Sequence, residues 1–139
     1  MNPIMIIWPM VILALVTLAI YFPMSRARVA SVKSGKVKGS VYKLNEGEPE
    51  ESKLFNGAIR NQYESPVLFY AVCVAAYATG NAGILMIILA WIFAIAKSIH
   101  VYVHISSNNL RVRRPVFMVA YFTLIALWIV FALQMSGIL

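Results

Sequence analysis

Three long stretches without a charged residue limit what this chain can fold into. They cover residues 4–22, 65–96 and 115–139. A helix needs about 20 consecutive apolar residues to cross the hydrocarbon core of a bilayer, and each stretch approaches or exceeds that length. Hydrophobic residues make up 61% of the 139 residues and the mean hydropathy is +0.78. Soluble domains contain about 45–50% apolar residues, so the sequence predicts an integral membrane protein.

A polar segment precedes the second stretch and must lie partly within the apolar zone. The turn signal Gly80-Asn81-Ala82-Gly83 leaves only residues 65–78 before it, which is too short to span a bilayer. The helix is therefore expected to reach back to about Gly57, and this places Glu64 inside or beside the apolar zone. An acid at the centre of a membrane helix costs about 2.5–3.5 kcal/mol on insertion scales, so Glu64 is expected to have a partner.

These patterns predict an all-α, integral membrane four-helix bundle that forms one domain. The expected helices cover about residues 4–22, 57–78, 84–104 and 115–137. Residues 24–55 are expected to form a long loop. Pro23 should end the first helix or bend its exit, and Pro115 suits the first position of the last helix. No basic segment precedes the first apolar run, so this run is expected to be a retained helix and not a cleaved signal.

The positions of the basic residues predict the orientation of the bundle. Seven of the twelve Lys and Arg residues lie in the loop 24–55, and three more lie within residues 111–114, while the second connection and both ends carry none. Basic loops remain in the cytoplasm, so both termini are expected to be non-cytoplasmic. This rule also accounts for the net charge of +7 without a nucleic-acid partner. The single Cys73 excludes an intramolecular disulfide and a cysteine-based metal site.

Two polar groups lie at matching depths on the second and third expected helices. Asn61 and Glu64 are three residues apart and share a helix face. Lys97 lies about as far from the end of the third helix as Glu64 lies from the start of the second. This favours either a Glu64–Lys97 ion pair or a Lys97 side chain that reaches the interface on its long stem.

Histidine and arginine residues gather near the same membrane face. His100 and His104 have the i, i+4 spacing of metal ligands, but they are the only histidines, so no metal site is expected. They are interpreted as interfacial or hydrogen-bonded side chains. Arg111, Arg113 and Arg114 lie at the start of the last helix, where the positive helix end adds to their charge. This arrangement suits a small anion or a bound thiolate, and the alternative is a membrane anchor.

The chain resembles the membrane-associated proteins in eicosanoid and glutathione metabolism, the MAPEG superfamily. Four short helices, a long basic first loop and Asn61-x-x-Glu64 with a nearby proline carry the resemblance. Residues 60–70 (RNQYESPVLFY) and 104–113 (HISSNNLRVR) are especially similar to its bacterial branch. The resemblance implies a multi-pass homotrimer in the bacterial inner (plasma) membrane. It also implies that glutathione binds between subunits near the cytoplasmic face.

The resemblance assigns roles to individual residues. Asn61 and Glu64 match the pair that holds glutathione, with Glu64 facing its amino group. Tyr102 matches a tyrosine of that pocket, and Arg113 matches the arginine that stabilises the glutathione thiolate.

Other arginines are expected near the same pocket. Arg111 and Arg114 are the alternatives to Arg113 for the thiolate. Arg26 or Arg28 would take the place of a first-helix arginine that contacts the tripeptide.

The chain departs from the transferases at two positions of this pocket. A basic residue four positions before Asn61 is here Gly57, and a second tyrosine, four after Tyr102, is here Ser106. Arg60 is the candidate to replace the missing basic residue.

The resemblance implies a glutathione-dependent membrane transferase or peroxidase. Its partners would be membrane lipid and a lipophilic small-molecule substrate, with glutathione as the co-substrate. The alternative is a non-catalytic membrane subunit or scaffold that retains the bundle. A transporter or channel is disfavoured, since one acid and no pair of broken helices make a poor ion path.

Overall fold

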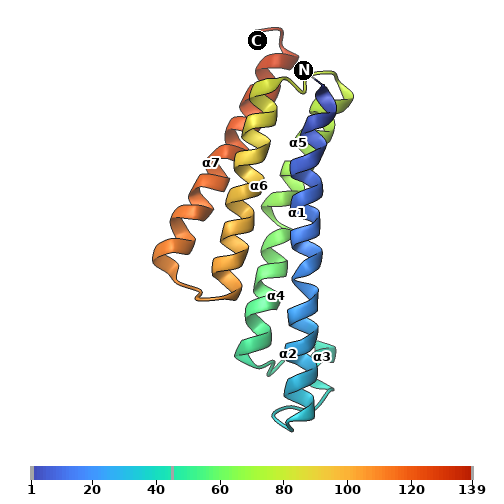
Figure 1. The fold of residues 1–139 in the computed structure, drawn as a ribbon, viewed down its shortest axis with the longest axis vertical. Helices are drawn as coiled ribbons and strands as arrows, with labels where there is room; N and C mark the ends of the chain where they lie inside the picture. Colours follow the sequence, from blue (N-terminus) through green and yellow to red (C-terminus); the bar gives the residue numbers. More distant parts are fainter. Residues whose placement is uncertain (1, 45, 139) are drawn as a thin grey trace.

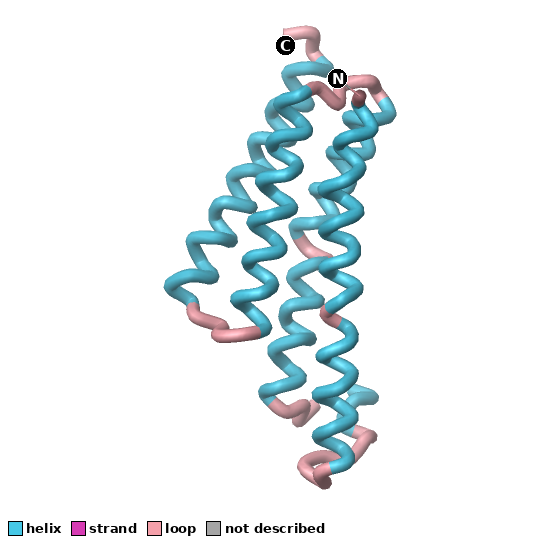
Figure 2. The backbone as a smooth tube through the Cα atoms, in the orientation of Figure 1, coloured by secondary structure: helices cyan, strands magenta, loops and turns pink. Residues whose placement is uncertain are grey.

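The computed structural model describes residues 2–44 and 46–138, and within them every regular element is a helix (Figures 1 and 2). The elements are a 3-10 helix η1 (Pro3–Ile6) and the helices α1 (Ile7–Ala19), α2 (Tyr21–Lys33), α3 (Val41–Leu44), α4 (Glu50–Gln62), α5 (Ser65–Ala78), α6 (Ile84–Ile105) and α7 (Leu110–Met135). Three helices are long and apolar enough to cross a membrane: Pro3–Lys33, Ile84–Ile105 and Leu110–Met135.

The first helix bends near Pro23 and continues beyond it. Proline has no N–H to donate, and the helix is interrupted at Ile20, between α1 and α2. The amide of Met24 then donates to the carbonyl of Ile20 at 3.2 Å, and the helix resumes as α2. The 31 residues from Pro3 to Lys33 span roughly 46 Å, which exceeds the hydrocarbon core of a bilayer.

The expected loop 24–55 is largely helical. The chain turns back after α2, and α4 begins after Pro49 with two acids in its first turn, where they complement the helix dipole. The carboxylate of Glu48 is 3% exposed and accepts hydrogen bonds from Arg28 Nε at 2.9 Å and Asn56 Nδ2 at 3.2 Å. Together α2, α3 and α4 form a basic lobe that extends past the ends of α6 and α7 (Figure 1).

The expected helix 57–78 is broken into α4 and α5. Tyr63 and Glu64 lie between them, with φ −96° and ψ −99° at Glu64. Pro66 disfavours helical geometry at the residue before it and cannot donate to the carbonyl of Gln62, which explains the break. The break lies beside the bend of the first helix, because Thr17 Oγ1 donates to Gln62 Oε1 at 3.3 Å. The 14 residues of α5 cover roughly 21 Å, less than a bilayer core.

The last helix begins five residues earlier than expected. The side chain of Asn109 accepts a hydrogen bond from the amide of Arg111 at 3.0 Å, so Asn109 is the N-cap and Leu110 the first helical residue. Pro115 consequently lies inside α7. Two antiparallel helices, α6 and α7, form the most extensive helix pair, and they separate toward the start of α7 (Figure 1).

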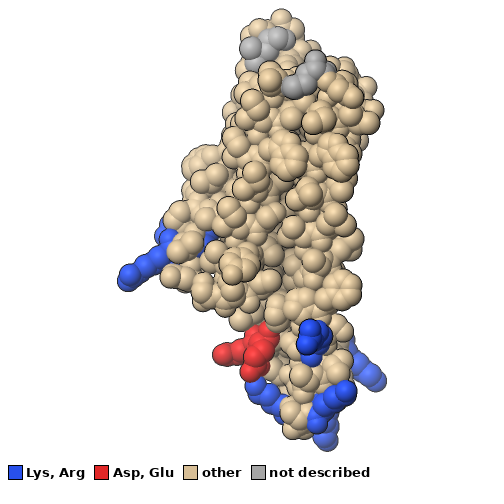
Figure 3. Space-filling model, in the orientation of Figure 1, with Lys and Arg blue, Asp and Glu red and all other residues tan. Residues whose placement is uncertain are grey.

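The apolar core lies in the half of the bundle near η1 and the end of α7. Phe69 of α5 and Phe93 of α6 are fully buried and stack with ring centroids 4.4 Å apart. Lys and Arg gather at the opposite end, over the basic lobe and the start of α7 (Figure 3). Charge and apolar packing are therefore separated along the long axis, as in a protein with one end in water.

The basic lobe should depend on the buried carboxylate of Glu48. Glu48→Ala removes the acceptor that joins α2 to α4, and it should destabilise the lobe by about 1–3 kcal/mol. Glu51→Ala is the matched control, because it removes an exposed ion pair with Lys36 that water screens. Hydrogen exchange of the α2 and α4 amides should accelerate only in Glu48→Ala, and equal exchange in both variants would contradict this role.

Candidate functional site

A cavity of about 790 Å³ lies where the end of α4, the last turns of α6 and the start of α7 approach one another. Its lining combines three arginines with apolar side chains: Asn61, His100, Leu110, Arg111, Arg113, Arg114, Pro115, Phe117 and Met118. The positive end of the α7 dipole adds to the charge of the arginines. A cavity of this kind favours a ligand that is both anionic and partly apolar.

Arg113 is the one arginine of this cavity whose side chain is turned inward to described protein partners. Its Nε donates to His100 Nε2 at 3.3 Å, and its Nη1 donates to Asn108 Oδ1 at 2.9 Å. Arg111 and Arg114 are exposed, and their side chains make no ion pair or hydrogen bond with the residues described here. The guanidinium of Arg113 therefore has a fixed position, as an anion-binding group requires.

On the opposite wall, Asn61 lies at the end of α4, where the broken helix leaves backbone carbonyls without helical partners. The ammonium of Lys97 donates to the carbonyl of Asn61 at 3.4 Å, and the Lys97 side chain is fully buried. Lys97 also lies over the ring of Phe117, with 5.8 Å from Nζ to the ring centroid. Lys97 thus contacts Asn61 and Phe117, two residues that line the cavity, without lining it itself.

The structure shows neither of the two arrangements expected for Lys97. Within residues 2–44 and 46–138, no ion pair joins it to Glu64, and the side chain does not reach the surface. Glu64 is exposed at the break and attracts the ammonium only through space. The helix break explains the difference, because it frees a carbonyl that lies closer to the ammonium than the carboxylate does.

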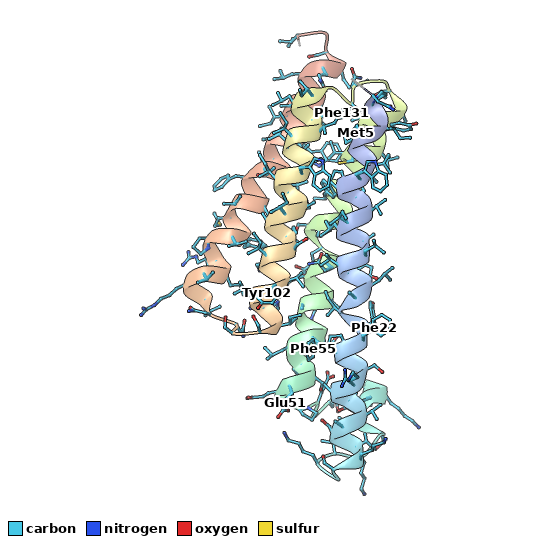
Figure 4. All side chains as sticks on the ribbon, in the orientation of Figure 1. Met5, Phe22, Glu51, Phe55, Tyr102 and Phe131 are labelled. Carbon is cyan, nitrogen blue, oxygen red and sulfur yellow. The ribbon has the colours of Figure 1, made fainter. Side chains whose placement is uncertain are left out.

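The remaining candidate residues of this chain do not line the cavity. Tyr102 is 70% exposed near the end of α6 and borders an apolar groove of about 270 Å³ between α6 and the first helix (Figure 4). Arg26 borders a separate depression on α2, beside Tyr21. Arg60 and Glu64 are exposed and are not among the residues that line the cavity. One chain therefore brings together Asn61 and Arg113, and it places Tyr102 and Arg26 on another face.

Sequence reasoning did not predict that Lys97, His100 and Asn108 hold Asn61 and Arg113 at the cavity. Lys97 and His100 are one turn apart on α6, and this spacing was the available signal for a shared role. Asn108 has φ +48°, a left-handed conformation that asparagine tolerates better than most residues. Its bond to Arg113 depends on the turn between α6 and α7, which residue types do not reveal. Among the described residues, no group of three potential metal ligands occurs.

The imidazole of His104 packs directly against Gly57 of α4. A Cβ built on Gly57 would lie 3.5 Å from Cε1 and 3.6 Å from Nε2 of the His104 imidazole. These are ordinary contacts, so alanine fits, whereas a long side chain pointing this way meets the ring. The contact limits the length of a side chain that points from position 57 toward His104, and it does not itself require glycine.

Substitutions of Gly57 should show whether a short side chain fits beside His104 and a long one does not. Gly57→Ala should raise stability by up to about 1 kcal/mol, because glycine is unfavourable inside a helix. Gly57→Arg should lower the thermal midpoint in detergent, because His104 must move. Arginine tolerated as well as alanine would show that the imidazole leaves this space open.

Lys97 is expected to weaken the fold. A buried ammonium loses several kcal/mol of hydration, and one hydrogen bond returns about 1–3 kcal/mol. Lys97→Met has similar length and no charge, so it should raise the thermal midpoint in detergent. Lys97→Ala is the control for lost volume and should melt below Lys97→Met. A lower midpoint for Lys97→Met than for the unmodified chain would contradict this view.

Comparison with known proteins identifies the family of this chain. No curated protein sequence matches it, and no solved structure matches it. The model of the MAPEG family matches residues 6–133, which is nearly the whole chain. Its helical, membrane-spanning architecture agrees with that match. The chain belongs to the MAPEG family.

Proposed function

We propose that this protein is a glutathione-dependent membrane transferase or peroxidase that acts on lipophilic electrophiles. The MAPEG family includes glutathione-dependent transferases and peroxidases. The observation that carries the proposal is the fixed guanidinium of Arg113 at a cavity of about 790 Å³ with both cationic and apolar walls.

The chemistry would be stabilisation of a thiolate. A nearby opposite charge lowers the pKa of an ionisable group by about 1–3 units, so Arg113 would favour the ionised sulfur of glutathione. The thiol proton passes to water, and the sulfur forms a bond to an electrophilic carbon of the second substrate. In a substitution the leaving group departs with its bonding electron pair, and in an addition to an activated alkene the π bond breaks and the neighbouring carbon takes up a proton from water. With a hydroperoxide, two glutathione molecules supply the electrons, and the products are an alcohol, water and glutathione disulfide.

The cavity supplies distinct surfaces for the two substrates. Arg111, Arg114 and the α7 N-terminus attract the carboxylates of a tripeptide. Phe117 and Met118 offer an apolar surface to the lipophilic partner. A second groove of about 460 Å³ between α5 and α7 is lined almost entirely by apolar side chains and gives that partner a path from the lipid.

A homotrimer would complete this site. The candidate residues of one chain lie on two faces, with Asn61 and Arg113 at the cavity and Tyr102 and Arg26 beside the first helix. A neighbouring subunit would bring the second face to the first, and Glu64 at the surface of the break would then meet the amino group of the tripeptide.

In the membrane, α4 and α5 together would form the fourth helix of the bundle. The basic lobe and the start of α7 would face the cytoplasm, and both termini would lie outside it, in a bacterial inner membrane. The separation of charge along the long axis supports this orientation (Figure 3).

A non-catalytic subunit of the same fold is the second candidate. His104 occupies the space beside Gly57 where the transferases that this chain resembles carry a basic residue. That observation favours a bundle whose ligand contacts have been reduced.

Glutathione binding in detergent distinguishes the two functions. The unmodified chain should bind glutathione and develop thiolate absorbance. Arg113→Ala should raise the pKa of the bound thiol by about 1–3 units. Glu64→Gln should weaken binding of the tripeptide without this shift, because the amino group loses its charged partner.

Lys38→Ala is the control for loss of positive charge, because Lys38 is exposed in the basic lobe. It should leave binding and ionisation unchanged. A chain that binds no glutathione, or Arg113→Ala with the titration of the unmodified chain, would favour the non-catalytic subunit.

A further inference from the structure

His100 and Asn108 hold Arg113 from two different elements. His100 belongs to α6 and is 2% exposed, while Asn108 belongs to the turn before α7. We propose that His100 and Asn108 are positioning residues that fix the Arg113 guanidinium at the cavity, and that this clamp determines how well a bound thiolate is stabilised. The inference rests on the proposed function for its ligand, while the clamp itself can be tested without glutathione.

The bond to His100 requires one form of the imidazole. A guanidinium only donates, so His100 Nε2 must carry a lone pair and the proton must lie on Nδ1. The ring is held by α6 and by contact with Phe117, whose centroid is 5.7 Å away. Three other titratable groups act on the His100 ring. His104 and Lys97 lie one turn to either side of it on α6, and Arg113 lies on α7. Within residues 2–44 and 46–138, no carboxylate forms an ion pair with this ring. Its Nε2 accepts from Arg113.

The turn that carries Asn108 is fixed on both sides. The amide of Asn108 donates to the carbonyl of Val103 at 2.8 Å, and the next residue, Asn109, caps α7. The left-handed φ of +48° directs the chain through this turn. The acceptor oxygen of Asn108 is therefore positioned before a ligand binds. The conformational entropy of the Arg113 side chain is lost on folding and not on ligand binding.

The clamp leaves part of the guanidinium available. Two bonds use Nε and one hydrogen of Nη1, and Nη2 has no partner among the residues that the structure describes. Arg113 lines the cavity, so these remaining donors belong to the surface that a ligand would contact. The exposed Arg111 and Arg114, on the same helix turns, provide the comparison: they contribute charge without a fixed geometry.

Variants that remove or restore an acceptor distinguish the loss of the hydrogen bond to Arg113 from a loss of folding. His100→Phe removes the acceptor and keeps an aromatic ring, while His100→Gln restores an acceptor near the position of Nε2. Asn108→Gly removes the side chain with its acceptor oxygen and suits the positive φ. If His100→Phe fails to fold, Asn108→Gly carries the test, because it leaves the buried face of α6 unchanged.

The first measurement follows the ionisation of bound glutathione. His100→Phe and Asn108→Gly should raise the pKa of the bound thiol toward its value in Arg113→Ala, and His100→Gln should restore most of the difference. Binding of S-methylglutathione, which has no thiol, should change less than about twofold in all three variants, because the clamp acts at the sulfur. Titrations of His100→Phe and Asn108→Gly that match the unmodified chain would overturn the proposal.

The second measurement needs no glutathione. Nitrogen-15 NMR of the unmodified chain in detergent should show His100 with a proton on Nδ1 only. The Arg113 Nε–H signal should shift in His100→Phe but not in His100→Gln. A proton on His100 Nε2 would overturn the clamp. If the chain binds no glutathione, the proposed function fails, and this spectrum still decides whether the clamp exists.

Discussion

The break between α4 and α5 creates the constraint on which the site depends. Apolar surroundings cannot hydrate the carbonyls that a broken helix leaves unpaired, so another element must supply donors. Lys97 on α6 supplies one to the carbonyl of Asn61 at 3.4 Å. A fully buried lysine is an expensive donor. Through this bond Lys97 holds the end of α4, where Asn61 lies at the cavity wall.

One face of α6 supports both walls of the cavity. Lys97 contacts the end of α4, and His100, one turn later, accepts from Arg113 of α7. Because α6 is an uninterrupted helix of 22 residues, the two contacts have a fixed spacing. A shift of either neighbouring helix along α6 would move Asn61 or Arg113 relative to the other.

The sequence predicts the membrane-embedded, all-helical class and the limits of α6, because long uncharged runs leave few alternatives. It does not predict the helices within residues 24–55, whose packing depends on Glu48 meeting Arg28 from a distant element. The length that a membrane span needs predicts one continuous helix over 57–78, but Pro66 favours a break, and the chain is not helical at Tyr63 and Glu64. Asn61 and Arg113 line one cavity within the chain, whereas the family resemblance implies a pocket between subunits. The bond from Lys97 could not be foreseen, because a freed backbone carbonyl has no signature in residue types.

Gly57 and His104 show that one departure from the transferases is a change of packing as well as of charge. His104 packs beside Gly57 of α4, so a basic side chain that points this way from position 57 would meet the imidazole. Among the residues that the structure describes, the buried basic side chains are Lys97, His100 and His104, and all three belong to α6. A ligand at this cavity would therefore be recognised by groups that α6 and α7 hold, with α4 contributing little beyond Asn61. The contact between α6 and α7, where the imidazole of His100 accepts from Arg113, therefore sets the position of this guanidinium at the cavity.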